Sequence, residues 1–282
     1  MLGEPSDADA LPPGTVSVVL VNYRSLADLA RLLDGPQLRG QRVVVVDNGD
    51  DPEGVRRLCA EHQASAVLLP DNVGFAAGVN AGVAALPGDA QEPVLLLNPD
   101  VCVTAATLLG LLAEIERGGD GAAPLLVQPG GRLQIGAAGG EFTTARIAAY
   151  FLFVSHAFPR VTGVFLTRRQ SLQRRPVAWL CMACVLLRRD ALVRFGPLPE
   201  DELVYAEDLA WGTSASLRGA DLRLVPELRV THATGSSGGS ALWVGSFERL
   251  CLRRLGPVSG RVGVLTMRIG LLLRRLVGRQ VS

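Results

Sequence analysis

The sequence predicts an α/β fold with a mostly parallel central sheet flanked by helices, and three observations support this. Short apolar runs end at polar residues, as buried strands do, and they occupy residues 16–21, 42–46, 66–69 and 94–97. Segments with a helical pattern separate these runs. Strands that alternate with helices at this spacing form βαβ units. The 282 residues, of which 48% are hydrophobic, suffice for one large domain with a sizeable core.

The first half of the chain follows this pattern closely. The helix after the first strand places four leucines on one face, at Leu26, Leu29, Leu32 and Leu33. A helix of small residues opens directly after Gly74, and its glycines would let it lie close to the sheet. Residues 104–116 predict another helix, and residues 122–127 predict a strand that completes this half.

The second half is less regular. Residues 128–175 form a glycine-containing excursion of weak pattern, and such loops often determine substrate choice. A helix is predicted to follow Glu207-Asp208. Strands are predicted over residues 177–180, 184–187 and 228–231, and the last of them ends at His232.

Residues 15–240 are expected to form the main domain, and the two ends differ from it. Residues 1–14 are acidic and Pro-rich, and they predict a flexible N-terminus without a signal-peptide pattern. Residues 241–282 predict a basic amphipathic helical tail in which arginines interleave with leucine, valine and isoleucine. Such a helix either lies at an anionic membrane surface or packs on the domain with its arginines in solvent, and composition leaves both readings open.

Composition limits the partners and the compartment. A formal net charge of +1 gives no argument for a nucleic acid as partner. All basic residues are Arg, so no mechanism can depend on a catalytic Lys. Five scattered cysteines fit a reducing compartment better than a disulfide framework, and no apolar run reaches the ~18 residues of a spanning helix. We expect a cytoplasmic protein, and the tail leaves open a peripheral contact with the inner face of the plasma membrane.

Carboxylates and a histidine follow the predicted strands or begin the predicted helices. Asp100 comes after the buried run 94–97, so it projects from a stiff support at the carboxyl edge of the sheet. A divalent cation held by a carboxylate and an imidazole, such as that of His232, neutralises a diphosphate leaving group. A second carboxylate, from Glu207 or Asp208, can take a proton from an attacking hydroxyl. Taken singly, each residue also has a structural explanation as a turn, a helix N-terminus or a buried histidine.

The order of these motifs resembles that of the family 2 glycosyltransferases. The resemblance covers residues 16–240 and runs through Asn22-Tyr23, Asp47-Asn48-Gly49, residues 72–82, Asn98-Pro99-Asp100, residues 179–189, Glu207-Asp208 and His232. Within the family the chain looks most like bacterial rhamnosyltransferases that build cell-wall or surface polysaccharide on lipid-linked acceptors. The resemblance implies a GT-A fold, inverting sugar transfer from a nucleotide-diphosphate donor, and a bound Mg²⁺ or Mn²⁺.

The resemblance also implies roles for single residues. A UDP- or dTDP-sugar would lie against Asn22, Tyr23, Asp47, Asn72, Gly74, Phe75, Asn80, Asn98 and Trp179. Tyr23 would meet the base, Asp47 the base or ribose, and Trp179 the sugar or acceptor side. Asp208, next to Glu207, would be the catalytic base, and Asp100 and His232 would hold the metal. Asn98 stands in place of the first Asp of the family's Asp-x-Asp motif, as in the rhamnosyltransferase-like members, so Asp100 must carry most of the coordination.

Two other functions are weighed against this one. Only Asn98 favours a non-catalytic GT-A scaffold, and a sugar nucleotidyltransferase typically uses a Lys and an Arg-bearing Gly-rich loop that the chain lacks. Cys181 and Cys184 have half the spacing of a zinc site but no second pair, so we interpret them as core side chains. Whether the acceptor is a free saccharide or a lipid-linked one, and whether the chain forms a homodimer, stays open.

Overall fold

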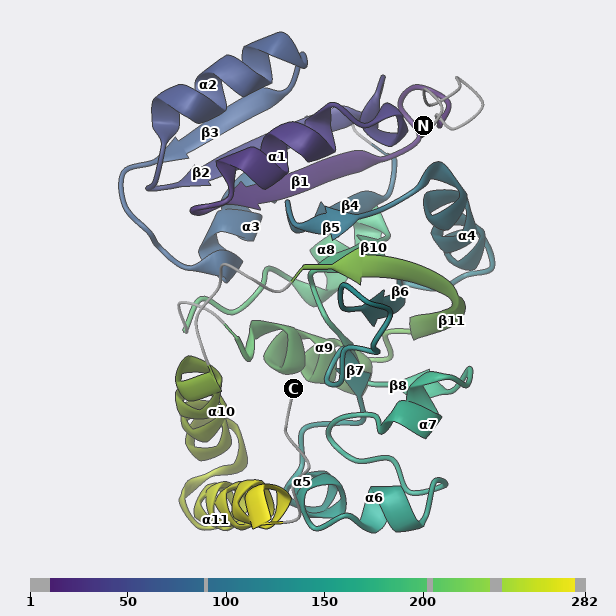
Figure 1. The fold of residues 1–282 in the computed structure, drawn as a ribbon, viewed down its shortest axis with the longest axis vertical. Helices are drawn as coiled ribbons and strands as arrows, with labels where there is room; N and C mark the ends of the chain where they lie inside the picture. Colours follow the sequence, from purple (N-terminus) through teal and green to yellow (C-terminus); the bar gives the residue numbers. More distant parts are fainter. Residues whose placement is uncertain (1–10, 89–90, 202–204, 234–239, 277–282) are drawn as a thin grey trace.

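The computed structural model describes residues 11–88, 91–201, 205–233 and 240–276, which form a mixed sheet with helices on both faces (Figure 1). The strands are β1 Ser17–Asn22, β2 Arg42–Asn48, β3 Ser65–Leu69, β4 Val94–Leu97, β5 Val101–Cys102, β6 Gly121–Val127, β7 Ala138–Gly139, β8 Pro176–Val177, β9 Trp179–Leu180, β10 Cys184–Leu187 and β11 Leu222–His232. The helices are α1 Leu26–Leu33, α2 Pro52–Glu61, α3 Phe75–Ala84, α4 Ala105–Glu116, α5 Thr144–Phe151, α6 Val154–Ala157, α7 Arg168–Ser171, α8 Arg189–Phe195, α9 Glu207–Leu217, α10 Ser240–Leu255 and α11 Pro257–Leu276, with a 3₁₀ turn at Pro36–Leu38.

The four strands predicted first are confirmed, and they pair in parallel. Their order is β3-β2-β1-β4, and β1 lies between β2 and β4. Because parallel strands end at the same edge, the polar residues that follow β1, β2 and β4 lie along one edge of the sheet. This edge carries the donor side of the candidate site.

The other half of the sheet is mixed and less parallel than the sequence predicted. β10 lies between β4 and β6 and runs antiparallel to both. β11 is longer than the predicted strand 228–231, because it begins at Leu222 and continues through a register shift between Val225 and Arg229. Pro226 and Glu227 interrupt the apolar pattern at this irregularity, which is why the sequence indicated only the second part of the strand.

A two-residue strand closes the sheet at its far edge. β5 pairs antiparallel with the end of β11, so Val101 lies opposite His232 and Cys102 opposite Thr231. The backbone carbonyl of Asp100 accepts a hydrogen bond from Ala233 N at 3.1 Å. This pairing brings the end of the fourth strand to the end of the last strand.

Two apolar cores lie on the two faces of the sheet. Helices α1, α2 and α4 cover one core, and α3, α8 and α9 cover the other (Figure 1). The predicted close approach of α3 to the sheet is confirmed, because a Cβ at Gly82 would lie 2.5 Å from Cγ1 of Val19. The helix therefore needs glycine at this position.

The two ends of the described chain pack on the domain. At the N-terminal end, Leu11 is buried and Nε2 of Gln41 donates to Pro12 O, whereas residues 1–10 of the predicted flexible segment 1–14 lie outside the described residues. A third apolar core joins α5, α10 and α11 around Phe247 and Trp179. Among the described helices, none is long and apolar enough to cross a bilayer.

Candidate active site

The carboxylate of Asp100 and the imidazole of His232 meet where β5 pairs with β11. Asp100 Oδ1 lies 3.3 Å from Nε2 of His232, and each side chain is 10% exposed. On its other side, Nδ1 of His232 lies 2.8 Å from Oε1 of Gln134, which precedes β7. Because an amide oxygen only accepts, the contact with Gln134 favours a proton on Nδ1, which leaves Nε2, on the Asp100 side, as the nitrogen that could bind a cation. The sequence predicted Asp100 and His232 but missed Gln134, which lies in the excursion of weak pattern.

This pair fits a divalent cation that is shared with a substrate. Carboxylate oxygen and imidazole nitrogen are both ligands for Mn²⁺, whereas Mg²⁺ prefers oxygen. Within the residues that the structure describes, no group of three His, Cys, Asp or Glu side chains is arranged so that it could hold a metal ion. Asn98, half-buried in the turn before Asp100, adds an amide instead of a charge. The remaining ligands would be diphosphate oxygens and water, as is common for cations that bind nucleotides.

Asp208 lies in the first turn of α9. Its Oδ1 accepts a hydrogen bond from Leu209 N at 2.8 Å. Burial raises the pKa of the Asp208 carboxyl to about 7, which the bond from Leu209 offsets in part. A carboxylate with a pKa near neutrality is well suited to accept a proton from a hydroxyl group. Its neighbour Glu207 is buried.

The backbone just before Asp208 is strained. Tyr205 and Ala206 have φ angles of 67° and 75°, a left-handed conformation that non-glycine residues adopt rarely. Each such residue costs about 1–3 kcal/mol and persists where the surrounding packing holds it, often at functional sites. The strained backbone is therefore a second reason, besides the Glu207-Asp208 motif, to regard the start of α9 as a candidate functional position.

The turn between β9 and β10 links the Asp100 side of the site to Asp208. Asn98 N donates to Ala183 O at 2.9 Å. Burial and the negative charge of Asp208 both raise the pKa of the Cys181 thiol, so this thiol lies near the Asp208 carboxylate. Cys184 is fully buried, as predicted for a core side chain, and burial raises its pKa to about 12.

Trp179 supports the site from beneath and does not line it. The residue is 0% exposed, and its indole Nε1 donates to Val164 O at 2.9 Å. A Cβ at Gly212 would lie 2.6 Å from Cα of Trp179, so α9 packs directly on β9. The prediction that Trp179 meets the sugar or acceptor does not fit this position, because no part of the residue reaches the surface. Its contact with α9 holds the helix that carries Asp208.

Replacing Trp179 with Phe should destabilise the fold without weakening donor binding. The change leaves Val164 O without the indole donor and opens a cavity, which should lower the free energy of unfolding by about 2–3 kcal/mol in a denaturant titration. Trp243→Phe, at a half-buried position on α10, is the matched control and should cost less than about 1 kcal/mol. If Trp179→Phe weakened donor affinity and left stability unchanged, Trp179 would line the site as the sequence predicts.

Asn22 and Asp47 hold the loops at the ends of β1 and β2. Both are 0% exposed, and Asn22 Nδ2 donates to Asp47 Oδ1 at 3.1 Å. The Asp47 carboxylate also accepts from the backbone N–H groups of Asp50 and Asp51, at 3.2 and 3.1 Å. Direct contact of these two side chains with a nucleotide, as predicted, is not compatible with their burial. They shape the turn that a nucleotide would meet.

The side chains next to them do reach the surface. Tyr23 is half-buried, and the Arg24 guanidinium lies 5.1 Å from its ring centre. Asp50, which the sequence prediction missed, accepts from Arg24 N at 2.7 Å and so joins the loops after β1 and β2. Of the two residues predicted to meet the base, Tyr23 is therefore the one whose side chain reaches the surface.

Asn48 fixes the loop that precedes α3. Its amide donates to Asn72 Oδ1 at 3.0 Å and accepts from Val73 N at 3.1 Å. Gly74 has a φ of 96°, which favours glycine, and it caps α3. Asn72 is exposed and Phe75 is half-buried, so both predicted residues border the surface at this edge.

Asn80 is bound within the protein. Its amide donates to Leu198 O at 2.8 Å and to Glu200 Oε1 at 2.7 Å, and it accepts from Leu198 N at 3.0 Å. The prediction placed Asn80 in the donor pocket. The structure instead shows that it anchors the loop that leads towards Tyr205.

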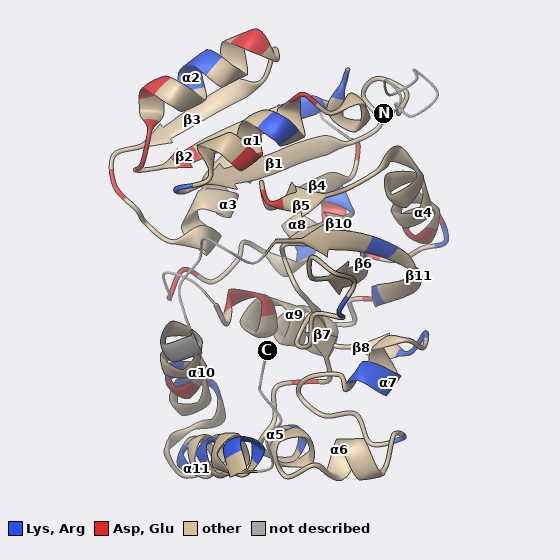
Figure 2. Cartoon of the chain, in the orientation of Figure 1, with Lys and Arg blue, Asp and Glu red and all other residues tan. Residues whose placement is uncertain are grey.

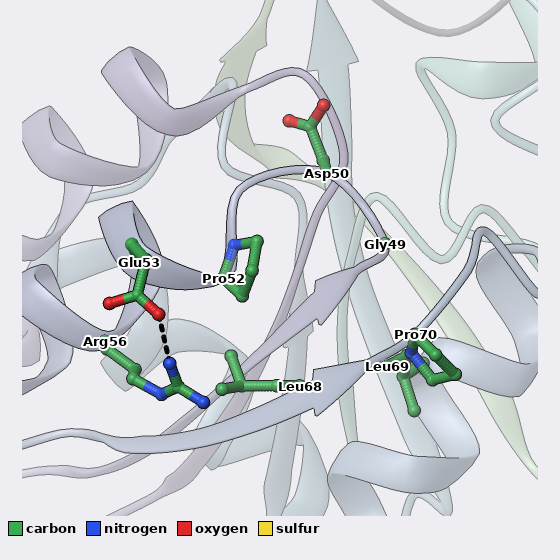
Figure 3. A pocket seen from close by; sticks show the side chains of 8 residues that line it. All are labelled: Gly49, Asp50, Pro52, Glu53, Arg56, Leu68, Leu69 and Pro70. Carbon is green, nitrogen blue, oxygen red and sulfur yellow. Dashed lines mark hydrogen bonds and ion pairs between the residues drawn. The ribbon is translucent and has the colours of Figure 1, made fainter.

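A hollow of about 530 Å³ opens beside the loop that follows β2 (Figure 3). It lies between α2 and the end of β3, and its walls include the ion pair of Glu53 and Arg56. None of the residues predicted for the donor lines it; the lining consists of Gly49, Asp50, Pro52, Glu53, Arg56, Leu68, Leu69 and Pro70. The hollow is therefore a neighbour of the candidate site and not the site itself.

The sequence of residues 17–195 matches the family described as glycosyl transferase family 2. The chain belongs to glycosyl transferase family 2. Asp208 and His232 lie beyond the matched residues. Membership in this family makes the protein a glycosyltransferase, in agreement with the sequence prediction. The two other functions, a non-catalytic scaffold and a sugar nucleotidyltransferase, are therefore not pursued.

Two kinds of relative extend this result. The chain is 29% identical over 248 residues to the N-acetylglucosaminyl-diphospho-decaprenol L-rhamnosyltransferase of Mycobacterium tuberculosis, covering 82% of this chain and 78% of that protein. Among solved structures, S. aureus TarS 1-349 is similar with a TM-score of 0.53 at 14% identity, over 93% of this chain and 73% of that one. GalNAc-T7, in a crystal structure with UDP, GalNAc and Mn²⁺, is similar with a TM-score of 0.57 at 14% identity. The similarity covers 84% of this chain and 48% of that one. The predicted GT-A fold is thereby confirmed.

Proposed function

We propose that this glycosyltransferase is an inverting, metal-dependent enzyme. It moves a sugar from a UDP- or dTDP-sugar to a hydroxyl of a lipid-linked saccharide, and the sugar that we propose is rhamnose. The observation that carries the proposal is the Asp100 and His232 pair at the edge of the sheet, linked through the turn at Ala183 to the raised-pKa carboxyl of Asp208. The similarity to a mycobacterial protein named as a rhamnosyltransferase supports the choice of sugar and acceptor.

The chemistry follows from these groups. Asp208 accepts the proton of the acceptor hydroxyl, whose oxygen forms a bond to the anomeric carbon. The bond from that carbon to the diphosphate oxygen breaks on the opposite face, and its electron pair leaves with the nucleoside diphosphate. When bound, a divalent cation at Asp100 and His232 supplies positive charge to this leaving group. Gln134 keeps His232 in the tautomer that can bind the cation.

A thermal-shift series tests this function. The protein is melted with dTDP-rhamnose, UDP-rhamnose or UDP-N-acetylglucosamine, each with Mn²⁺ and with a chelator. A donor at 100 times its Kd stabilises the folded state by about 2.7 kcal/mol, which raises Tm by several degrees in a chain of this size. We expect such a shift for one rhamnose donor, only with the metal. An equal shift with the chelator would show that donor binding does not need a metal. No shift with any donor would contradict the proposal.

The free thiols support a cytoplasmic location for the transfer. All five cysteines are free in the structure, and three of them, Cys59, Cys184 and Cys251, are buried. Free thiols are the usual state in the cytoplasm. We propose that the transfer takes place there.

A further inference from the structure

Helix α11 has two opposite faces, and one of them is fixed against the domain. This inner face packs on α5 and α10 and consists of Gly260, Gly263, Met267, Gly270 and Arg274, all buried. The glycines allow a close approach: a Cβ at Gly270 would lie 2.5 Å from an oxygen of the α5 backbone, and one at Gly260 would lie 2.6 Å from an oxygen of the α10 backbone.

Arg274 holds this orientation. The residue is 5% exposed, and its guanidinium lies 4.5 Å from the ring centre of Phe153 and 4.8 Å from that of Tyr150. It also donates to the backbone oxygens of Tyr150 and Phe151, at 3.0 and 3.2 Å. An arginine bound in this way cannot face solvent. The opposite face of α11 must therefore point away from the domain.

The opposite face is an apolar stripe in solvent. We call it the outer stripe, and it consists of Val258, Val262, Leu265, Ile269, Leu272, Leu273 and Leu276, which are 37% to 75% exposed. Apart from the adjacent pair Leu272 and Leu273, they follow one another at intervals of three or four residues, which keeps them on one side of a helix. Together with Leu242 and Leu252 of α10, they make up nine of the 18 exposed large apolar side chains in the described chain. A concentration of this kind on two helices indicates a contact surface.

Positive charge borders the stripe. The two helices contain seven arginines and one acidic residue, Glu248. Arg261, Arg268 and Arg275 recur every seven residues along one flank of the outer stripe, and Figure 2 shows basic segments along α11. A groove of about 340 Å³ runs between the helices, lined by Glu248, Leu252, Arg261, Val264, Leu265 and Arg268. The surface thus combines apolar side chains with cations that suit a phosphate group.

We propose that the outer stripe and its arginines dock the protein on a bilayer that contains anionic phospholipid, with α11 lying in the plane of the interface. Apolar side chains on one face and arginines beside them are the features of interfacial helices. A second copy of this chain is a poorer occupant, because two such faces would bring two rows of arginines together. The inference goes beyond the proposed sugar transfer and does not depend on it.

Vesicle sedimentation tests the proposal with the full chain. Vesicles of phosphatidylcholine, alone or with phosphatidylglycerol, are mixed with the wild-type protein, a Leu265→Glu and Ile269→Glu double variant, and Leu217→Glu as a matched control. Leu217 is 74% exposed on α9, outside the proposed surface. We expect wild type and control to bind the anionic vesicles at least about tenfold more tightly than the neutral ones, and the double variant to lose about tenfold or more. Arg261→Gln should weaken binding about fivefold, and added salt should weaken it further.

Three results would overturn the proposal. The first is equal affinity for anionic and neutral vesicles, or none for either. The second is an equal loss in the Leu217→Glu control, which would show that any added acid weakens binding. The third is a wild-type dimer, seen by sedimentation equilibrium, that the double variant converts to a monomer, because the outer stripe would then bind a second copy. Equal melting temperatures of wild type and double variant establish that the changes leave the fold intact, as their exposure predicts.

Discussion

Replacing Asp208 with Asn is expected to lower the rate of sugar transfer about 10³-fold while the donor Kd changes by less than about threefold. The amide keeps the size of the carboxyl group but cannot accept the proton of the acceptor hydroxyl. Initial rates of transfer and calorimetric donor titrations, both with saturating Mn²⁺, separate the two quantities. Asp201→Asn removes an exposed carboxylate a few residues earlier and is the matched control. Transfer at the wild-type rate in D208N would exclude Asp208 as the base.

The pH dependence of transfer gives the same prediction a second readout. Because burial raises the pKa of Asp208 to about 7, the carboxyl is protonated and inactive as a base below this pH. We expect kcat/KM for the acceptor to rise through pH 7 and to level off above about pH 8. In D208N this rise should be absent from the residual activity.

Stability should change with pH in the opposite sense. The pKa of Asp208 is raised from 3.8 to about 7 in the folded protein, so the folded state holds a proton that the unfolded state has released. The contribution of this proton to the free energy of unfolding is fully present below about pH 4 and is lost as the pH rises through 7. The total loss is at most about 4 kcal/mol. D208N lacks this loss. Urea titrations should therefore find the variant more stable than wild type at pH 8, and by less at pH 5.

Removing either member of the Asp100 and His232 pair is the second change with a large expected effect. Asp100→Asn and His232→Ala should each reduce transfer about 100-fold and abolish the dependence of donor affinity on Mn²⁺. Gln134→Leu leaves both ligands in place but releases the tautomer of His232, so a loss of about tenfold in Mn²⁺ affinity is expected. Calorimetric titration of Mn²⁺ in the presence of the nucleoside diphosphate measures both effects.

The chain offers a matched control for this experiment. Nε2 of His62 lies 3.5 Å from Oδ1 of Asp34, and this histidine and carboxylate pair joins the C-terminal ends of α2 and α1, away from the Asp100 and His232 pair. His62→Ala should leave the Mn²⁺ titration unchanged. If His232→Ala also left it unchanged, the pair at the sheet edge would be structural and the proposed metal site would be wrong.

The sequence was a good guide to strands with continuous apolar runs and a poor guide to short or interrupted ones. β1 to β4 are predicted because each contains a continuous apolar run that ends at a turn. β5 has two residues and no pattern of its own, so only the paired end of β11 reveals it. Gln134 precedes β7 in the irregular excursion, where neither periodicity nor a motif distinguishes it.

For the site, the sequence indicated which positions gather but not which of them are exposed. Asn22 and Asp47 follow strands at the correct edge, yet a polar residue that holds a loop has the same local pattern as one that binds a ligand. The sequence pattern groups Arg274 with the other arginines of the tail, in solvent or at a membrane, whereas the structure buries it. The glycines at 260, 263 and 270 mark the packed face of α11, and Arg274 falls on that face, four residues after the last of them.

The position of β10 limits how this enzyme can be divided. β10 comes after the irregular excursion, and it pairs with β4 over residues 94–97. A fragment that ends before residue 184 would leave the apolar strand Val94–Leu97 without one of its neighbours, and an open edge of this kind promotes aggregation. The N-terminal part of the chain, which carries the loops after β1, β2 and β3, is therefore not a separable module. A chimaera that takes these loops from a relative would have to bring the matching β10 as well.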